Sequence, residues 1–390
     1  MLFVAFGALV LVPLLTGLDP NVALFTAGVG TLIFQVITKG KVPIFLASSF
    51  AFLPPIMYGV KAWGIPQTMC GLAAAGVVYI ILSFIVRWRG SDIIHKVLPP
   101  VVTGPVIMVI GLILAPIAVD MVTGKTGSIP KDTSLIIGLA ALSTTVLVSI
   151  LGKGFMKLIP IISGIVVGYV IALFYGVVDF SAITAASWFS IPNFVTPEWN
   201  LEAVIFIIPI AIAPAIEHFG DVVAISGVTG KDYLKDPGIK NTMLGDGIAT
   251  SFASCLGGPP NTTYSEVTGA VALTKVFNPA IMTWAAIAAI LLAFVGKLGA
   301  FLQTIPTPVM GGIMLLLFGA IMVIGLNTLV KSKEDLMEAR NLSIVALIII
   351  FGMGGMSLSA GQFTLQGIGL AGILGVLMNL LLPGKTKKSE

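Results

Sequence analysis

Long apolar segments follow one another along almost the whole chain, and no other feature constrains its fold as strongly. We count 14 segments near the roughly 20-residue length that a helix needs to cross a bilayer, some of them interrupted by Gly or Pro. Their approximate centres are residues 9, 29, 51, 76, 110, 143, 167, 211, 248, 267, 286, 316, 348 and 373. Charged residues make up 10% of the 390 residues, against about 25% in soluble domains. The sequence therefore predicts an all-α integral membrane protein in which residues 1–390 form a single unit embedded in the lipid bilayer.

Basic residues divide unevenly between the two sides of the predicted membrane region. If the segments cross alternately from a cytoplasmic start, 17 of the 21 Lys and Arg residues fall on one side and 4 on the other. Loops rich in Lys and Arg stay in the cytoplasm, so we expect a multi-pass protein with both termini there. The first residues, MLFVAFGALVLVPLL, lack a basic start and a cleavage site. We expect a first span that begins abruptly, where a short cytoplasmic leader would ordinarily stand.

The two halves of the chain carry traces of each other. LPPVVTG at 98–104 and IPTPVMG at 305–311 share a Pro, a Val and a Gly at the same places, 207 residues apart. An odd number of spans per repeat makes the second copy enter the membrane from the opposite side. Seven spans twice therefore predict an inverted repeat, which is typical of transporters that open alternately to the two sides of the membrane.

Two of the segments are too rich in Pro, Gly and hydroxyl residues to form continuous helices. They read KVPIFLASSFAFLPP at 41–55 and GGPPNTTYSEVTG at 257–269. Irregular backbone at membrane depth is tolerated where it is buried in protein or lines a cavity. The hydroxyl groups in these segments could equally well contact a polar solute or satisfy the interrupted backbone; they belong to Ser48, Ser49, Thr262, Thr263 and Tyr264.

Four acidic residues are predicted to lie inside the membrane region. They are Glu217, Asp221, Asp246 and Glu266, and the first two stand four residues apart on one helical face, with His218 beside them. Intramembrane ionisable groups are costly, so their default interpretation is functional; the alternative is a structural polar cluster that ties helices together. We expect His218 to have a packing or supporting role. Burial and mutual repulsion favour the protonated carboxyl groups, so such a cluster could take up and release protons.

The charge pattern also bears on what the chain could carry. Every basic residue falls in a loop or at a span end, so the four acids have no buried Lys or Arg partner. This arrangement suits proton-coupled transport of a neutral solute with N–H donors better than transport of an anion. With 2 histidines far apart in sequence and no paired cysteines, we find no constellation of an enzyme and no metal site.

Several long strings together resemble one family of membrane proteins over almost the whole chain. PNTTYSEVTGAVALTK, AIEHFGDVV, KGKVPIFLASSFAF and IPTPVMGGIMLLLFG occur in the order typical of the nucleobase/ascorbate transporter family. The chain is most similar to the bacterial uracil permease branch of that family. The resemblance implies proton-coupled uptake of a nucleobase, uracil in the first place, across the bacterial cytoplasmic (inner) membrane. It implies no cofactor besides the coupling protons, no enzymatic activity and no nucleic-acid partner.

The resemblance also implies an architecture. Spans 3 and 10 would contain short antiparallel strands that meet at the substrate. A core domain would comprise residues 1–90 and 201–296, and a gate domain residues 97–178 and 297–383. Members of the family commonly form homodimers.

The resemblance assigns roles to individual residues. Glu217 and Glu266 match the two glutamates that accept hydrogen bonds from the base, and Phe50 and Ser265 match positions whose backbone amides face it. Asp221 stands where the uracil branch has a histidine and is our candidate for proton coupling, together with Glu217 and Glu266. Ser49, Thr263, Asp246 and His218 are secondary candidates, and Tyr264 joins the candidates for substrate contact.

Three departures from the uracil branch keep the choice of base open. Asp221 and Asp246 both match aspartates of the purine branch, and Val267 replaces the usual Asn after Glu266. Xanthine or another oxopurine is therefore the alternative substrate. A more remote alternative is an anion carrier of the same architecture, but a cationic or neutral residue would be expected there in place of Glu266.

Overall fold

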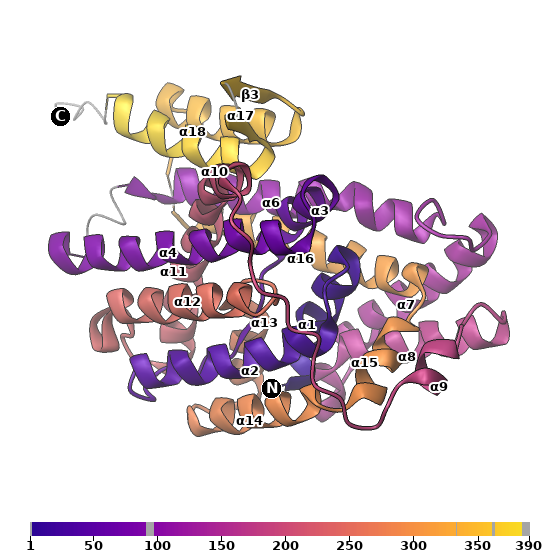
Figure 1. Cartoon of the computed structure of the whole chain (residues 1–390). Coiled ribbons are helices and arrows are strands. Elements are labelled where there is room, and N and C mark those ends of the chain that lie inside the picture. The colour runs from indigo at the N-terminus through magenta and orange to yellow at the C-terminus, as the bar shows by residue number, and fades with distance from the viewer. Residues whose placement is uncertain (1, 91–96, 333, 361–362, 384–390) are drawn as a thin grey trace.

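Helices make up most of the structure, a computed structural model that describes residues 2–90, 97–332, 334–360 and 363–383 (Figure 1). Within this part of the chain, six helical segments are long and apolar enough to cross a membrane. They are Pro20–Ile37, Ile65–Arg89, Pro100–Val122, Lys131–Leu151, Leu201–Thr229 and Thr307–Ser332. Five lysines counted on the basic side lie outside the described residues: Lys96, Lys333, Lys385, Lys387 and Lys388.

The elements follow the predicted segments closely. In the first half they are α1 (Leu2–Thr16), α2 (Pro20–Ile37), β1 (Leu46–Ser48), η1 (Phe50–Phe52), α3 (Leu53–Ala62), α4 (Ile65–Arg89), α6 (Pro100–Val122), α7 (Lys131–Leu151), η2 (Gly154–Leu158), α8 (Pro160–Phe174) and α9 (Ser181–Ala185). In the second half they are α10 (Leu201–Ile207), η3 (Ile208–Ala211), α11 (Ile212–Thr229), η4 (Leu234–Gly238), α12 (Ile239–Cys255), β2 (Asn261–Thr263), α13 (Ser265–Thr274), α14 (Ala280–Ala293), α15 (Gly296–Gln303), α16 (Thr307–Ser332), α17 (Ala339–Met353), β3 (Ser357–Ala360), β4 (Phe363–Gln366) and α18 (Gly367–Leu381). Each of the 14 predicted centres falls inside a helix or an interrupted segment.

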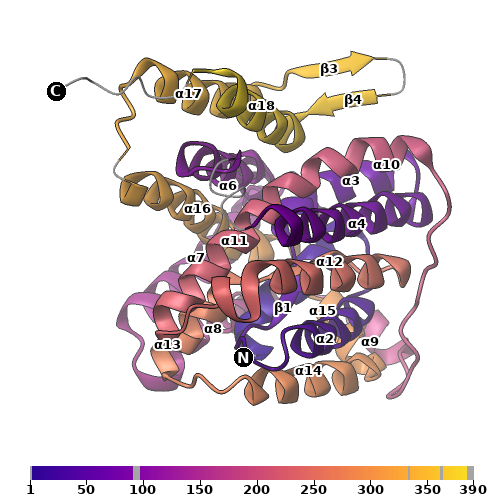
Figure 2. The same ribbon diagram turned by 90° about the vertical axis from the view of Figure 1, so that its left-hand side faces the viewer.

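Four helices from both halves of the chain form one row. Figures 1 and 2 show α4, α12, α2 and α14 stacked in that order, and each packs against the next. Glycines bring their backbones close together. A Cβ atom on Gly76 of α4 would lie 2.7 Å from the carbonyl oxygen of Gly247 in α12, and one on Gly28 of α2 would lie 2.6 Å from that of Ala286 in α14. Small residues allow such close helix crossings inside a membrane.

A second group of helices packs around α6 and α16. Helix α7 packs against α8 and α16, and α17 packs against α18 and α6. The glycine shared by the two sequence motifs is Gly104 in α6 and Gly311 in α16. Each lies near the start of its own helix and packs against the last part of the other helix. A Cβ on Gly104 of α6 would lie 2.9 Å from the carbonyl oxygen of Gly325, and one on Gly311 of α16 would lie 2.6 Å from Cβ of Met121. The two matching sequence motifs therefore occupy equivalent positions in the packing of α6 against α16.

Two short antiparallel strand pairs interrupt the helical structure. Strands β1 and β2 pair with Leu46 opposite Thr263, Ala47 opposite Thr262 and Ser48 opposite Asn261, which confirms the strands expected in the third and tenth segments. The hairpin of β3 and β4 is not among the sequence predictions. Figure 2 shows it at one end of the molecule, beside α17 and α18.

Candidate functional site

The β1–β2 pair is held by side chains from the two central helices of the four-helix row. The Thr31 hydroxyl of α2 accepts a hydrogen bond of 2.9 Å from the backbone N–H of Leu46, and Gln35 Nε2 donates to the carbonyl oxygens of Val42 and Ile44. On the opposite side, the Thr250 hydroxyl of α12 donates to the Asn261 carbonyl oxygen at 2.8 Å. The irregular backbone is therefore buried and satisfied by protein, as structure at membrane depth requires.

The hydroxyls of Ser48 and Ser49 are not used for this purpose. Both side chains are buried, and within the described part of the chain neither Oγ atom has a hydrogen-bond partner. The side-chain oxygen and nitrogen of Asn261, opposite Ser48, are likewise without a partner there. Leaving a buried polar group unpaired costs about 1–3 kcal/mol. The strand pair thus presents polar atoms that a bound polar solute could satisfy.

Each strand leads directly into the start of a helix. Helical structure begins at Phe50 after β1 and at Ser265 after β2. The first N–H groups of a helix have no partner within it and carry a partial positive charge. The backbone amides of Phe50 and Ser265, the predicted donors to the substrate, therefore belong to the first residues of these helical segments.

The structure brings the four predicted acids into one region. Glu217 and Asp221 lie on α11, and Glu217 interacts electrostatically with Asp221, Glu266 and Asp246. Asp221 and Asp246 are buried as expected. Glu217 and Glu266 are only half-buried, less than was expected of acids inside the membrane region. In the case of Glu266, the reason is that it lines an open pocket.

His218 and Asp246 form a hydrogen-bonded pair that is completely enclosed. The Nδ1 atom of His218 lies 2.8 Å from Oδ2 of Asp246, and its Nε2 atom lies 3.0 Å from the hydroxyl oxygen of Thr242. The backbone N–H of Thr263 also donates to Asp246, at 3.3 Å, and the Thr263 hydroxyl lies 3.4 Å from His218 Nδ1. This network joins α11 and α12 to β2, so its geometry is that of a support for the strand pair.

Tyr79 is a buried residue of this region that is not among the sequence predictions. It lies on α4, is fully buried, and its phenol interacts with the carboxylates of Asp246, Glu217 and Asp221. In the described part of the chain its hydroxyl has no hydrogen-bond partner. A tyrosine in an apolar helix gives no signal by itself; only the contact between α4 and α12 places it beside the acids.

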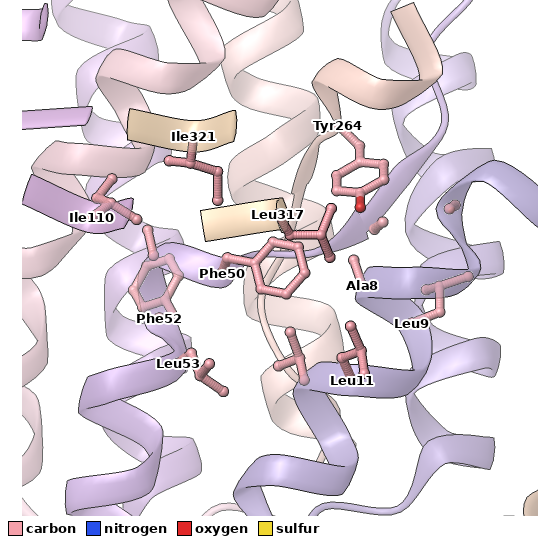
Figure 3. Close-up of a cluster of buried hydrophobic side chains, with 14 of the residues drawn as sticks. Ala8, Leu9, Leu11, Phe50, Phe52, Leu53, Ile110, Tyr264, Leu317 and Ile321 are labelled. Carbon is pink, nitrogen blue, oxygen red and sulfur yellow. The ribbon is translucent and has the colours of Figure 1, made fainter. Parts of the chain in front are cut away.

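Aromatic side chains close one side of the region. Figure 3 shows Phe50 next to Leu317 of α16, with Tyr264 to one side, Ile321 of α16 to the other, and the Tyr264 hydroxyl directed toward Ala8 of α1. The Phe50 ring centroid lies 6.5 Å from that of Tyr264 and 6.0 Å from that of Phe318, the latter edge to face. Side chains from α1, η1, α16 and the residue that precedes α13 therefore meet in one apolar layer.

A pocket of about 180 Å³ opens onto Glu266. Its walls come from α1, α13, η2 and the start of α8; they are Val4, Lys157, Ile159, Pro160, Ile161, Glu266, Gly269, Ala270 and Leu273. Lys157 is exposed, as predicted for a basic residue in a loop. Although Lys157 is not a buried partner of the acids, it lines the same cavity as Glu266. Among the residues that the structure describes, no three His, Cys, Asp or Glu side chains are placed to hold a metal ion.

Solved structures of other transporters share the fold. The chain resembles SLC26A9 with a TM-score of 0.68 and 15% sequence identity, over 97% of this chain and 63% of that one. It resembles the transmembrane domain of the cyanobacterial bicarbonate transporter BicA with a TM-score of 0.64 and 14% identity, over 97% of this chain and 94% of that one. At these identities the likeness concerns the fold alone.

Sequence comparison is more specific. The chain is 58% identical to a "Probable uracil permease" of Pasteurella multocida over 98% of this chain and 92% of the relative. It is 58% identical to a "Probable uracil permease" of Haemophilus influenzae over 100% and 94%, and 44% identical to the "Uracil permease" of Bacillus caldolyticus over 100% and 92%. A sequence model described as "Permease family" matches residues 1–361. The chain therefore belongs to this permease family, as a multi-pass membrane transporter and not an enzyme.

Proposed function

We propose that the chain takes up uracil together with protons across the bacterial cytoplasmic membrane. One observation carries the proposal: carboxylates of α11 and α13 stand beside two interrupted segments whose buried polar atoms lack partners within the described chain. Uracil carries two ring N–H donors and two ring carbonyl acceptors. It therefore needs both acceptors and donors from the protein, and this site offers both. The relatives named uracil permease support the same substrate.

In the proposed complex, Glu217 and Glu266 accept hydrogen bonds from the ring N–H groups. The backbone amides of Phe50 and Ser265 donate to the ring carbonyls. The Phe50 and Tyr264 rings cover the base on its apolar side. Ser49 and Thr263, on the strand pair or next to it, are secondary contacts, while His218 and Asp246 hold the strand pair in place.

Proton coupling is assigned to the acid cluster. Asp221 is buried beside Glu217, where two negative charges in a poorly solvated space repel each other. A proton on this cluster relieves the repulsion and permits binding of a neutral base. Asp221 is our candidate for the coupling residue, with Glu217 and Glu266 sharing the proton. No cofactor besides protons is proposed.

The proposed architecture has 14 spans in two inverted repeats of seven. The row α4, α12, α2, α14 belongs to a core domain of residues 1–90 and 201–296. The group around α6 and α16 belongs to a gate domain of residues 97–178 and 297–383. Reciprocal packing of Gly104 and Gly311 supports the inverted relation. Both termini are proposed to be cytoplasmic, and the transporter to act as a homodimer.

Xanthine or another oxopurine is the second candidate substrate. It is favoured by Asp221 and Asp246, which match aspartates of the purine branch, while Val267, where the family usually has Asn, leaves the choice open. An anion carrier is disfavoured because carboxylates, and no buried cation, face the strand pair in the described structure.

Uptake of labelled uracil and xanthine into cells that lack their own carriers tests the proposal. We expect saturable uptake of uracil that collapses when a protonophore is added, because the proton gradient drives accumulation. Cells with an empty vector provide the control. Uptake that persists unchanged with a protonophore would rule out proton coupling, and uptake of xanthine in preference to uracil would reverse the order of the two substrates.

A further inference from the structure

The pocket beside Glu266 has an asymmetric charge environment. Glu217 and Asp221 approach Glu266 from α11, and the Tyr264 phenol stands at the start of its own helix. Helices α1 and α8, which complete the walls, carry no charged side chain. An ionised Glu266 is therefore repelled by two neighbouring carboxylates, and Lys157 is the one cation that lines the pocket in the described structure.

Lys157 is free to respond to this charge. It lies in the short helix η2 before α8, its side chain is exposed, and among the described residues it forms no ion pair. A lysine side chain can lay its methylene stem along apolar walls and extend its ammonium group some distance from the backbone. The other residues that line the pocket are apolar, among them Ile159 and Ile161.

The two residues belong to different proposed domains. Lys157 lies in the gate segment 97–178 and Glu266 in the core segment 201–296. When the domains move relative to each other, the distance between the two side chains must change. The attraction between Lys157 and Glu266 therefore acts in the conformation in which the pocket opens beside Lys157. The distribution of basic residues puts Lys157 on the cytoplasmic side.

We propose that Lys157 is a state-specific counter-ion for ionised Glu266, which promotes release of the coupled proton into the cytoplasm. The inference rests on the proposed proton-coupled function. In this step the Glu266 carboxylic acid loses its proton to water in the pocket, and the resulting carboxylate is stabilised by the Lys157 ammonium group. An opposite charge within about 4–6 Å favours the ionised carboxylate. The carboxylate that accepted from a ring N–H group is drawn toward the ammonium group and away from the base, so substrate and proton leave on the same side.

Comparison of net uptake with exchange tests this role. Net uptake requires the carrier to release its proton inside and return empty, whereas exchange of labelled for unlabelled uracil can proceed with the proton retained. We expect Lys157→Gln to reduce net uptake roughly five-fold, which corresponds to about 1 kcal/mol for a pair of charges 4 Å apart in water. Exchange in preloaded proteoliposomes should stay within about two-fold of wild type. Raising the internal pH should restore net uptake, because proton release then no longer needs the cation.

Two matched variants make the result specific. Lys157→Arg keeps the charge and should retain net uptake, and Lys153→Gln removes an exposed charge at the start of the same short helix, outside the pocket, and should have no effect. Equal loss of net uptake and exchange in Lys157→Gln, an equal effect of Lys153→Gln, or unchanged net uptake would overturn the inference. Wild-type uptake that is insensitive to a protonophore would instead refute the coupling mechanism itself, and the inference with it.

Discussion

At the scale of single residues, the acids of this region divide into two groups with different surroundings. Asp246 is fully buried and accepts hydrogen bonds from the His218 ring and from the Thr263 backbone. Glu217 and Glu266 are half-buried, and Glu266 lines a pocket. A fixed and fully enclosed carboxylate suits a support, while an accessible one can meet a substrate and exchange a proton.

The first prediction concerns the enclosed pair. Asp246→Ala leaves the His218 ring and the Thr263 N–H without their acceptor, and breaking a buried pair costs about 3–5 kcal/mol. We expect a markedly lower thermal unfolding midpoint of the purified protein in detergent. The control is Asp120→Ala, which removes an exposed ion pair with Lys125 and should change stability by less than about 1 kcal/mol. Normal stability of Asp246→Ala combined with lost uracil binding would contradict the supporting role.

The second prediction concerns Glu266. Glu266→Gln replaces one carboxyl oxygen with an NH₂ group that cannot accept a hydrogen bond, and leaving a buried donor unpaired costs about 1–3 kcal/mol. We expect the dissociation constant for uracil to rise by at least about tenfold. Binding of labelled uracil to purified protein measures this change, with Lys153→Gln as the unaffected control. Unchanged affinity would remove Glu266 from the substrate contacts.

The third prediction concerns Asp221. Asp221→Asn keeps the shape of the side chain but removes the titratable group. We expect the uracil dissociation constant and the exchange rate to stay within about three-fold of wild type, a difference of less than about 1 kcal/mol. Accumulation against a concentration gradient should be lost. If Asp221→Asn still accumulates uracil against its concentration gradient, and a protonophore abolishes this accumulation, another acid carries the coupled proton.

At the scale of elements, close helix crossings fix the positions of the strand pair and the acids. Helix α12 carries Asp246 and supports β2, and it crosses α4, which carries Tyr79, at Gly76 and Gly247. A Cβ on Gly76 would lie 2.2 Å from the Ser251 hydroxyl oxygen and 2.5 Å from the Ser251 nitrogen. The site thus depends on the absence of side chains at this crossing.

A bulky residue at this crossing gives the fourth prediction. Gly76→Leu forces α4 and α12 apart, because the neighbouring atoms include backbone that cannot move aside. We expect little folded protein in the membrane and a loss of uracil binding in what remains. Gly227→Ala in α11 is the control, because no atom lies within 4 Å of the added Cβ, and it should fold at least as well as wild type. Normal folding and binding of Gly76→Leu would show that the crossing is looser than the structure indicates.

At the scale of the whole molecule, the proposed core and gate meet along a seam of apolar side chains. Phe50 contacts Phe318 of α16, and a Cβ on Gly7 of α1 would lie 3.2 Å from Cδ1 of Ile161 in α8 (Figure 3 shows the Phe50 part of the seam). Apolar contacts of this kind can slide or separate without leaving a charge unpaired. The seam is therefore suited to relative movement of the two groups of helices.

The fifth prediction tests that movement. In a background with Cys70 and Cys255 replaced by Ser, we expect Hg²⁺ to cross-link Gly7→Cys with Ile161→Cys and to stop uracil uptake until a thiol is added. The control pair is Ala141→Cys with Gly168→Cys, which joins α7 to α8 inside the gate, where the two Cβ positions lie 3.0 Å apart. Cross-linking this control pair should leave uptake intact. Continued uptake with a fully cross-linked Gly7–Ile161 pair would mean that core and gate do not separate there.

Much of this organisation follows from local features of the chain. The centres of the apolar segments follow from hydropathy, because a span must shield its backbone from lipid. The interruptions at 41–55 and 257–269 follow from Pro, Gly and hydroxyl residues that cannot continue a helix. Glu217, Asp221, Asp246 and Glu266 stand out because charge is costly in such surroundings. The sequence also indicated that the two halves are repeats, through the shared Pro, Val and Gly of two short motifs.

Other features depended on contacts between residues far apart in the chain. The pairing of Asp246 with His218, the approach of Tyr79 to the acids and the shared pocket of Lys157 and Glu266 each involve elements that meet only after folding. The β3–β4 hairpin was also missed, because short strands at the end of an apolar helix have no distinctive hydropathy pattern. Hydropathy and residue type thus determined which segments enter the membrane, where they break and which acids lie within it. The tertiary structure decided which acids are enclosed and which open to a pocket, because burial and pairing depend on residues that are distant in the sequence and come together only on folding.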